Sequence, residues 1–104
     1  MRLRLSPHVP ADLEEIADYI ASDSPRHALR VLQLLRARMK EIAMQPELYR
    51  LPELGKEARL ATTGQYVILF RIRSNSVRIE RVVHGGRDPL PLLEEPESHD
   101  RRDD

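Results

Sequence analysis

Apolar and charged residues alternate strictly over residues 65–88, on both sides of a short Ser74-Asn75-Ser76 segment. Alternation with period two is typical of a strand with one buried face, so this pattern predicts a β-hairpin. A two-residue turn at Asn75-Ser76 would join partners whose numbers sum to 151. The pairs are then Ile72 with Ile79, Ile68 with Val83, and Arg71 with Glu80. A three-residue turn is disfavoured because it would place charged residues opposite Phe70 and Ile72.

Two helices are predicted upstream, where apolar residues recur every three or four positions. The first follows Ser6-Pro7, a cap and a first-turn proline, and keeps its apolar positions from Val9 to Ile20 on one face. The second follows Ser24-Pro25 and runs for about five turns, up to Pro46. Its apolar stripe consists of Ala28, Leu32, Leu35, Met39 and Ile42, broadened by Leu29 and Val31. The short link between the two predicts an antiparallel helical hairpin.

Alternation also predicts strands over residues 2–5 and 57–62, the second followed by a turn at Thr63-Gly64. The expected fold class is therefore α+β, with the order β-α-α-β-β-β and a helical hairpin packed on a small antiparallel sheet. Beyond Asp88 the chain is rich in proline and acidic residues. We expect one domain over residues 1–90 and an acidic, flexible tail over residues 91–104, whose leucines are still able to pack on the domain.

The formal net charge of zero hides a strong segregation of charge. Residues 24–87 carry thirteen Lys or Arg against five Glu, whereas residues 88–104 carry two Arg against seven acids. Fifteen of the seventeen cationic residues are Arg, which grips carboxylates and phosphates with a planar fork. The middle segment thus favours a polyanionic partner, either nucleic acid or an acidic protein segment. A solvated surface that happens to be rich in arginine would give the same composition.

Several classes of site are excluded or disfavoured. The chain has no cysteine, so it has neither disulfides nor thiolate metal ligands. Its four histidines lack the spacing of metal ligands, and no glycine-rich phosphate loop follows a strand, so no cofactor is expected. No apolar run is long enough to cross a membrane and no signal peptide is recognisable, so we expect a cytoplasmic protein without a membrane partner.

Two residues near the second hairpin strand invite a chemical interpretation. His84 is expected beside Arg87 and near Arg71, where an imidazole among guanidiniums could act as a general acid or base on RNA. Alternatively, His84 only bonds to backbone at the end of the strand. Arg81 is expected on the apolar face, where it either pairs with a carboxylate, for example from the first helix, or lines a groove between helices and sheet.

Four features of the chain occur together: the element order, Leu5-Ser6-Pro7 followed by residues 11–16, residues 66–71, and above all the ending Ile79–Asp88 with its His84-Gly85-Gly86-Arg87-Asp88. In these features the chain resembles the RelE/ParE superfamily of bacterial toxins. The resemblance covers residues 2–90 and implies a type II toxin–antitoxin module. RelE-like members cleave mRNA on the ribosome, whereas ParE-like members poison DNA gyrase.

Two departures favour the ParE branch: no tyrosine follows the last strand, and only two lysines are present. The resemblance then implies an inhibitory binding protein without catalytic residues, neutralised by a ParD-like antitoxin with an acidic and apolar C-terminal segment, and contacting operator DNA only through that antitoxin. The predicted partner-binding residues are Arg59, Arg71, Arg73, Arg81, His84 and Arg87. Two alternatives stay open. One is a metal-independent mRNA endonuclease using Arg59, Arg81 and His84; the other is a non-toxic remnant that only binds antitoxin.

Overall fold

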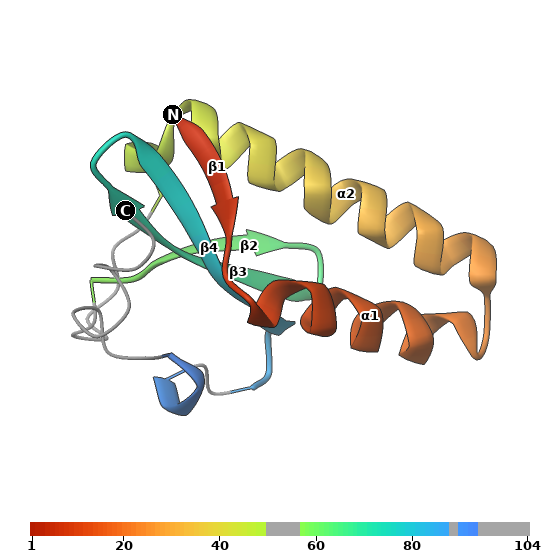
Figure 1. Ribbon diagram of the computed structural model, residues 1–104. Helices are drawn as coiled ribbons and strands as arrows, with labels where there is room; N and C mark the ends of the chain where they lie inside the picture. Colours follow the sequence, from red (N-terminus) through yellow and green to blue (C-terminus); the bar gives the residue numbers. More distant parts are fainter. Residues whose placement is uncertain (50–56, 88–89, 94–104) are drawn as a thin grey trace.

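The computed structural model describes residues 1–49, 57–87 and 90–93. The elements are β1 (Arg2–Leu5), α1 (His8–Ala21), α2 (Pro25–Met44), β2 (Arg59–Thr63), β3 (Tyr66–Arg73) and β4 (Ser76–His84), with short 3-10 helices at Pro46–Leu48 and Leu90–Leu92. The two long helices form a hairpin that packs on one face of the sheet (Figure 1). The predicted α+β class and the order β-α-α-β-β-β are confirmed.

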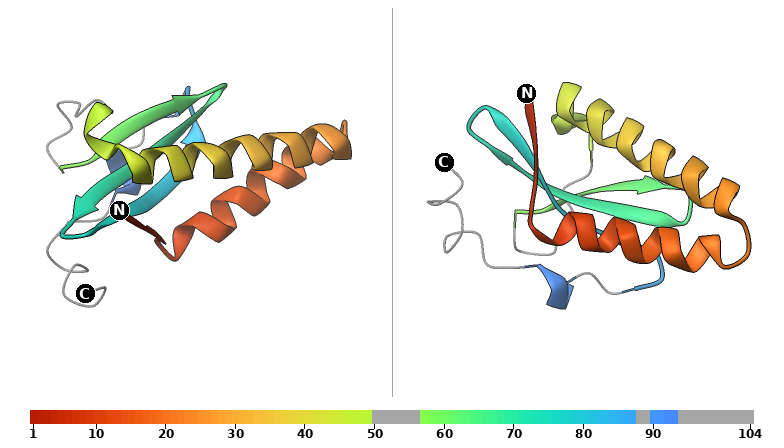
Figure 2. Two further views of the ribbon diagram at one scale, coloured as in Figure 1. Left: turned by 90° about the horizontal axis from the view of Figure 1, so that it is seen from above. Right: turned by 45° about the vertical axis from the view of Figure 1, so that its right-hand side comes forward.

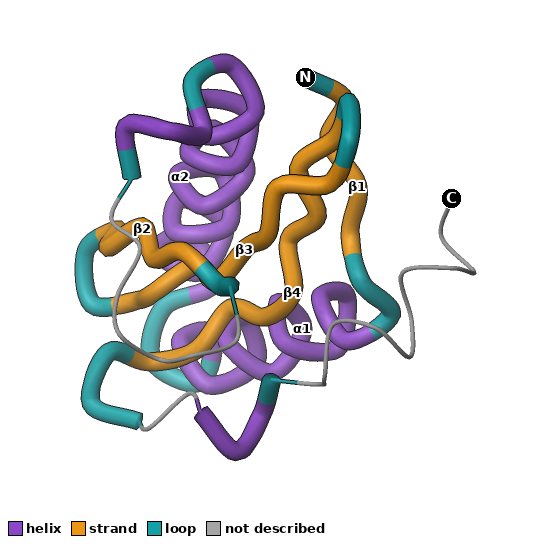
Figure 3. The backbone as a smooth tube through the Cα atoms, turned by 90° about the vertical axis from the view of Figure 1, so that its left-hand side faces the viewer, coloured by secondary structure: helices purple, strands orange, loops and turns teal. Residues whose placement is uncertain are grey.

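The sheet has the strand order β1-β4-β3-β2 (Figure 3). β3 is antiparallel to both of its neighbours, β2 and β4, but β1 runs parallel to β4. The expectation of an antiparallel sheet is therefore wrong for β1, and the sheet is mixed. Tight turns force the β2-β3 and β3-β4 pairs to be antiparallel, whereas β1 reaches β4 only through the helical hairpin and two strands, so no turn sets its direction.

The β3-β4 register differs from the predicted one. The turn consists of Ser74 and Asn75, so Arg73 pairs with Ser76 and the pair numbers sum to 149 rather than 151. Ser74 takes a φ of 43°, which starts the turn one residue earlier than expected. A β-bulge then follows, because Ile79 pairs with Phe70 and Arg81 with Leu69, leaving Glu80 as the extra residue.

The bulge exchanges the faces of β4 beyond Glu80, because one inserted residue shifts the period-two pattern. Val82 now joins the core under the helices, and Val83 joins Leu69 on the far face of the sheet. The predicted face that grouped Arg81 and Val83 with the helix-side core is thus wrong. So is the predicted proximity of His84 to Arg71, because His84 pairs with Tyr66, and alternation along β3 sends Tyr66 and Arg71 to opposite faces.

Two apolar clusters hold the layers together. The larger lies between helices and sheet and includes Leu35, Ile42 and Phe70, each at most 1% exposed. The smaller lies on the far face and consists of Ala58, Leu69, Val83 and Leu93. Packing of the described chain therefore includes Leu93, one of the leucines expected to be able to pack on the domain. Residues 94–104 of the predicted tail lie outside the described residues.

The start and the buried stripe of α2 follow the sequence prediction closely. The Ser24 hydroxyl accepts a hydrogen bond from the His27 backbone N–H at 3.2 Å, as expected of an N-cap. Of the predicted stripe, Ala28, Leu35, Met39 and Ile42 are buried and Leu32 is partly buried. Leu29 does not broaden the stripe, since it is 58% exposed.

Candidate functional site

Two adjoining hollows open beside the helical hairpin, where the β2-β3 turn and the end of β4 approach it. They measure about 450 Å³ and 470 Å³ and share Tyr19, Gln65 and Tyr66. We call them together the hairpin groove. The first hollow is also lined by Ile20, Asp23, Ser24, His27, Val31, Leu34, Leu35, Thr63 and Gly64. The second is also lined by Asp12, Glu15, Ile16, Val82, Val83, His84 and Arg87.

Aromatic rings mark the middle of the groove. Tyr19 projects from α1 with 80% of its surface exposed, although large aromatic side chains are usually covered. Tyr66 at the start of β3 meets the His84 ring edge to face, with ring centres 5.7 Å apart. His84 Nδ1 accepts a hydrogen bond from the Gly86 backbone N–H at 3.2 Å. In this arrangement the proton of the neutral imidazole is on Nε2.

The phenol of Tyr66 is held in its neutral form. Burial raises the pKa of Tyr66 above its ordinary value, and the neighbouring Tyr19 raises it further. At neutral pH the Tyr66 hydroxyl is therefore a hydrogen-bond donor and acceptor rather than a base. This chemistry suits recognition of a partner better than proton abstraction.

Gly85 ties the end of β4 to the β2-β3 turn. Its backbone N–H donates to the Gln65 carbonyl at 2.8 Å. A Cβ atom at this position would lie only 3.2 Å from the same oxygen, so a side chain would push the two segments apart. The close approach favours glycine and holds the segment that carries His84 and Arg87 against the β2-β3 turn.

A carboxylate on α1 fixes β4 beneath the groove. Asp12 accepts hydrogen bonds from Arg81 Nε at 2.9 Å, from Arg81 Nη2 at 2.8 Å and from the Val82 backbone N–H at 3.0 Å. We call these three residues the Asp12 junction. The structure therefore contains the predicted pair between Arg81 and a carboxylate of the first helix. Asp12 itself was not among the predicted site residues, although its spacing from Val9 and Ile16 puts it on the apolar face of α1.

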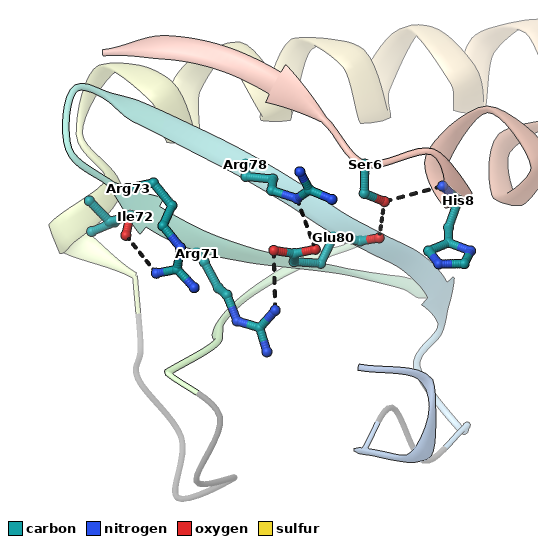
Figure 4. A network of polar contacts seen from close by, with 7 residues as sticks. All are labelled: Ser6, His8, Arg71, Ile72, Arg73, Arg78 and Glu80. Atoms are coloured by element: carbon teal, nitrogen blue, oxygen red, sulfur yellow. Dashed lines mark hydrogen bonds and ion pairs between the residues drawn. The ribbon is translucent and has the colours of Figure 1, made fainter. Parts of the chain in front are cut away.

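A second polar network lies elsewhere, around the bulge residue Glu80 (Figure 4). The Glu80 carboxylate pairs with Arg71 Nη1 at 3.2 Å and with Arg78 Nε at 3.3 Å, and the side chains of Arg71 and Arg78 are only 3% and 11% exposed. Ser6 Oγ donates to the Glu80 carbonyl at 2.6 Å and accepts from the His8 backbone N–H at 3.2 Å. The network thus joins the link between β1 and α1 to β3 and β4, and its burial favours a structural role.

The family model described as "ParE toxin of type II toxin-antitoxin system, parDE" matches residues 3–89. The chain belongs to this family of ParE toxins. The predicted resemblance to the ParE branch is confirmed. Among solved structures, a chain of the "Chromosomal ParDE TA system from P. aeruginosa" matches with a TM-score of 0.72 and 24% identity, over 81% of this chain and 95% of that one. At this identity the likeness supports the fold. The comparison with curated proteins gives no significant match.

The fold of this ParE toxin separates the residues that sequence reasoning had grouped. Of the six predicted partner-binding residues, only His84 and Arg87 line the hairpin groove, and Arg81 touches its lining residue Asp12. Arg71 belongs to the network around Glu80. Arg73 Nη1 donates to the Ile72 carbonyl at 3.1 Å, near the β3-β4 turn. Arg59 Nη1 donates to the Tyr49 carbonyl at 2.9 Å, on the β2 side of the sheet.

The residues proposed for an endonuclease in this ParE toxin are similarly dispersed. Arg59 lies opposite Phe70 and His84 opposite Tyr66, which are about 13 Å apart along β3 at 3.3 Å per residue. Arg81 is held by Asp12. Within the described residues no three His, Asp or Glu side chains gather where they could hold a metal ion. Among the same residues, no helix is both long and apolar enough to cross a membrane.

Sequence reasoning missed Tyr19, Gln65 and Tyr66, the residues shared by both hollows. Gln65 lies in the β2-β3 turn and Tyr66 at the start of β3. Their proximity to Tyr19 therefore depends on how the helical hairpin packs on the sheet. Only the exposed position of Tyr19 carried a signal. On α1 it lies three residues after Ile16 and beside the apolar Ile20, and an aromatic residue at the margin of an apolar stripe indicates a possible contact surface.

Proposed function

We propose that this ParE toxin acts in the cytoplasm by binding DNA gyrase and trapping its cleaved complex with DNA, without catalysis of its own. We further propose that a ParD-like antitoxin neutralises it by laying an acidic and apolar C-terminal segment into the hairpin groove, and that operator DNA is reached through this antitoxin. The observation that carries the proposal is the groove itself, which offers apolar and cationic side chains together.

The lining of the groove supports a peptide partner of this composition. Ile16, Val31 and Leu34 provide apolar wall, and Tyr19 adds a large exposed ring. His84 and Arg87 gather cationic and hydrogen-bonding groups in the second hollow. Glu15 and Asp23 also line the groove, so we expect acidic partner residues opposite His84 and Arg87 rather than along the whole segment.

A second candidate function is ribosome-dependent mRNA cleavage. The observation that favours it is the presence of Tyr66, His84 and Arg87 in one hollow of about 470 Å³. The raised pKa of Tyr66 disfavours that residue as a base, and Arg59 lies on a different part of the sheet. Of Tyr66, His84 and Arg87, His84 is then the candidate acid or base. His84→Gln, which keeps hydrogen bonding but removes proton transfer at neutral pH, separates the two candidates.

The deciding experiment is pulse-labelling of DNA and protein synthesis in a bacterial host, minutes after the toxin is induced alone. A gyrase poison stops DNA synthesis first and remains toxic as His84→Gln. An endonuclease stops protein synthesis first and loses toxicity as His84→Gln. If neither synthesis falls while the protein accumulates, the chain is a remnant without toxicity. Purified gyrase with supercoiled DNA then tests the target directly, through accumulation of cleaved DNA.

Binding of the antitoxin is tested with a pair of exposed apolar residues. Tyr19 lies in the groove and Leu48 lies outside it, and the two are 80% and 75% exposed. Because neither side chain belongs to the core, Tyr19→Ala and Leu48→Ala should leave thermal stability unchanged. We expect Tyr19→Ala to weaken binding of the cognate antitoxin about tenfold or more, as for an aromatic interface residue, and Leu48→Ala to leave it unchanged. Equal affinities for the two variants would move the antitoxin site elsewhere.

A further inference from the structure

The solvent side of α2 carries a continuous stripe of polar and cationic residues. The stripe follows the helical spacing of three and four residues, so its members lie along one line of the helix. All of them are exposed, whereas Leu35 and Met39 on the other side of α2 are buried. We call it the outer stripe; its residues are Arg26, Arg30, Gln33, Ala37 and Lys40. Seen from above, α2 lies in front of the sheet and no described element covers it (Figure 2).

The charge of this helix is unusually one-sided. α2 contains five Lys or Arg and a single acid, Glu41. Glu41 is already paired with Arg38 at 3.3 Å, beside the stripe. Among the described residues, no ion pair involves Arg26, Arg30 or Lys40. The stripe is therefore an exposed line of positive charge that the described part of the protein does not neutralise.

The neighbouring helix has the opposite charge. α1 contains four acids and no Lys or Arg. One of the four, Asp12, is buried in the Asp12 junction, while Glu14, Glu15 and Asp18 are exposed. A polyanion would be repelled by α1 and attracted by α2, so the hairpin restricts a negatively charged ligand to one side of the molecule.

We propose that the outer stripe binds the phosphate backbone of duplex DNA. From Arg26 to Lys40 the stripe is about 21 Å long, at 1.5 Å per residue. Over that length a DNA duplex presents a charge about every 1.7 Å of its axis, so each cation of the stripe finds a phosphate. Two of the three cations are Arg, whose fork suits phosphate oxygens. Gln33 adds a neutral donor, and the small Ala37 permits close approach of the backbone.

The composition of the stripe favours DNA over an acidic protein partner. Interfaces between proteins are depleted of charge at their centre and enriched in aromatic residues and Met. The stripe has three cations and no large apolar residue between Arg26 and Lys40, and the exposed Leu29 lies beside it rather than within it. None of its members lines the hairpin groove, so DNA and antitoxin would occupy separate surfaces. This direct contact adds to the indirect one through the antitoxin, and it does not rest on gyrase as the target.

The test measures the salt dependence of DNA binding by the full chain, prepared by cell-free synthesis. Fluorescence anisotropy follows a labelled duplex of about 20 base pairs between about 50 and 200 mM salt. With three phosphate contacts, the slope of log K against log salt concentration should be about −2.7, which is about a 40-fold loss of affinity over that range. Arg30→Gln should bring the slope to about −1.8, and the Arg26→Gln/Arg30→Gln/Lys40→Gln variant should abolish binding.

Two control variants make the outcome specific. Arg87→Gln removes one positive charge beside α1 rather than from α2, and it should leave the slope unchanged. Arg30→Lys keeps the charge on the stripe and should retain a slope of about −2.7. The proposal is overturned if the duplex does not bind at 50 mM salt, if the triple variant binds like the parent chain, or if Arg87→Gln lowers the slope as much as Arg30→Gln does. Tighter binding of single-stranded RNA with no effect of the triple variant would also overturn it. Circular dichroism of each variant confirms that the helices are intact.

Discussion

Loss of the Asp12 carboxylate should destabilise this protein more than loss of any exposed charge. Asp12 is 8% exposed and accepts three hydrogen bonds, two from Arg81 and one from the backbone N–H of Val82. In Asp12→Ala the Val82 N–H, on a residue only 2% exposed, loses its partner at a cost of about 1–3 kcal/mol. The ion pair with Arg81 is lost as well. We expect a total of about 3 kcal/mol, at the low end for a broken buried pair, because the Arg81 side chain is 16% exposed and can turn toward water.

A double-mutant cycle separates the ion pair from the backbone contact. Asp12→Ala, Arg81→Ala and the double variant are unfolded with urea and followed by circular dichroism. We expect a coupling energy of about 2 kcal/mol between the two side chains, within the range measured for residues in contact. The control is the ion pair of Arg38 and Glu41, both on α2, which is also hydrogen-bonded, at 3.3 Å, but has side chains that are 35% and 60% exposed. Its coupling energy should stay below about 0.5 kcal/mol.

The reasoning fails if the two cycles give equal coupling energies, because burial would then not distinguish the Asp12 junction from a surface pair. It also fails if the coupling of Asp12 with Arg81 disappears in about 1 M salt, since partly buried charges are poorly screened. The same variants report on the role of Arg81 in binding. If its guanidinium only positions β4, Arg81→Ala should weaken antitoxin binding to the same extent at low and high salt.

Three further predictions concern single residues. Ser6→Ala should cost about 2 kcal/mol in urea unfolding, because it removes the 2.6 Å bond to the Glu80 carbonyl inside the protein, and Ser6→Thr should recover part of the loss. Gly64→Ala should cost about 1 kcal/mol, because Gly64 has a φ of 60° with no atom within 4 Å of a Cβ, and Gly64→Asn should cost less. The raised pKa of Tyr66 stabilises the fold below the unfolded value near pH 10, and this contribution is lost as pH rises through the higher folded value. Tyr66→Phe should therefore lose less stability above pH 10 than the parent chain, as measured by urea unfolding at several alkaline pH values.

Local signals in the sequence were sufficient to predict the elements and their order. The start of α2 at Ser24-Pro25 depends on a hydroxyl cap and on the backbone angles of proline, both within a few residues of each other. The buried positions Ala28, Leu35, Met39 and Ile42 follow from a spacing of three and four residues. Such features depend on neighbours in the sequence, so they can be predicted without knowledge of the contacts between distant segments.

The register of the sheet could not be predicted in the same way. Alternation predicts which residues share a face only as far as the first β-bulge. The bulge at Glu80 has no glycine or proline in β4 that would indicate it in the sequence. The Glu80 carboxylate is held by Arg71 and Arg78 and its carbonyl by Ser6, which precedes it by 74 residues. The parallel pairing of β1 also depends on contacts between distant segments. In both cases the deciding interactions are made only in the folded chain.

The candidate site was half predicted for the same reason. His84 and Arg87 were recognised because they lie together at the end of a strand, next to glycines that allow a close turn. Tyr19 and Gln65 were missed because they reach the groove from a helix and from a turn, at different points of the chain. Arg59, Arg71 and Arg73 were grouped with His84 and Arg87 because of their charge. Charge carries no information about which face of the sheet a side chain occupies.

The arginines in the middle of the chain therefore have different roles, and the burial of each side chain distinguishes structural ion pairs from exposed charge. Arg71 and Arg78 pair with Glu80 inside the fold, and Arg81 pairs with Asp12, so these cations are committed to internal carboxylates. Breaking such pairs changes stability before it changes recognition. Arg87 is exposed, and so are the cations of α2 apart from Arg38, which is partly buried and paired with Glu41. Among the described residues, the outer stripe of α2 and the His84–Arg87 end of the hairpin groove are therefore two surfaces that can meet an anionic partner, and because they share no residue, substitutions test them one at a time.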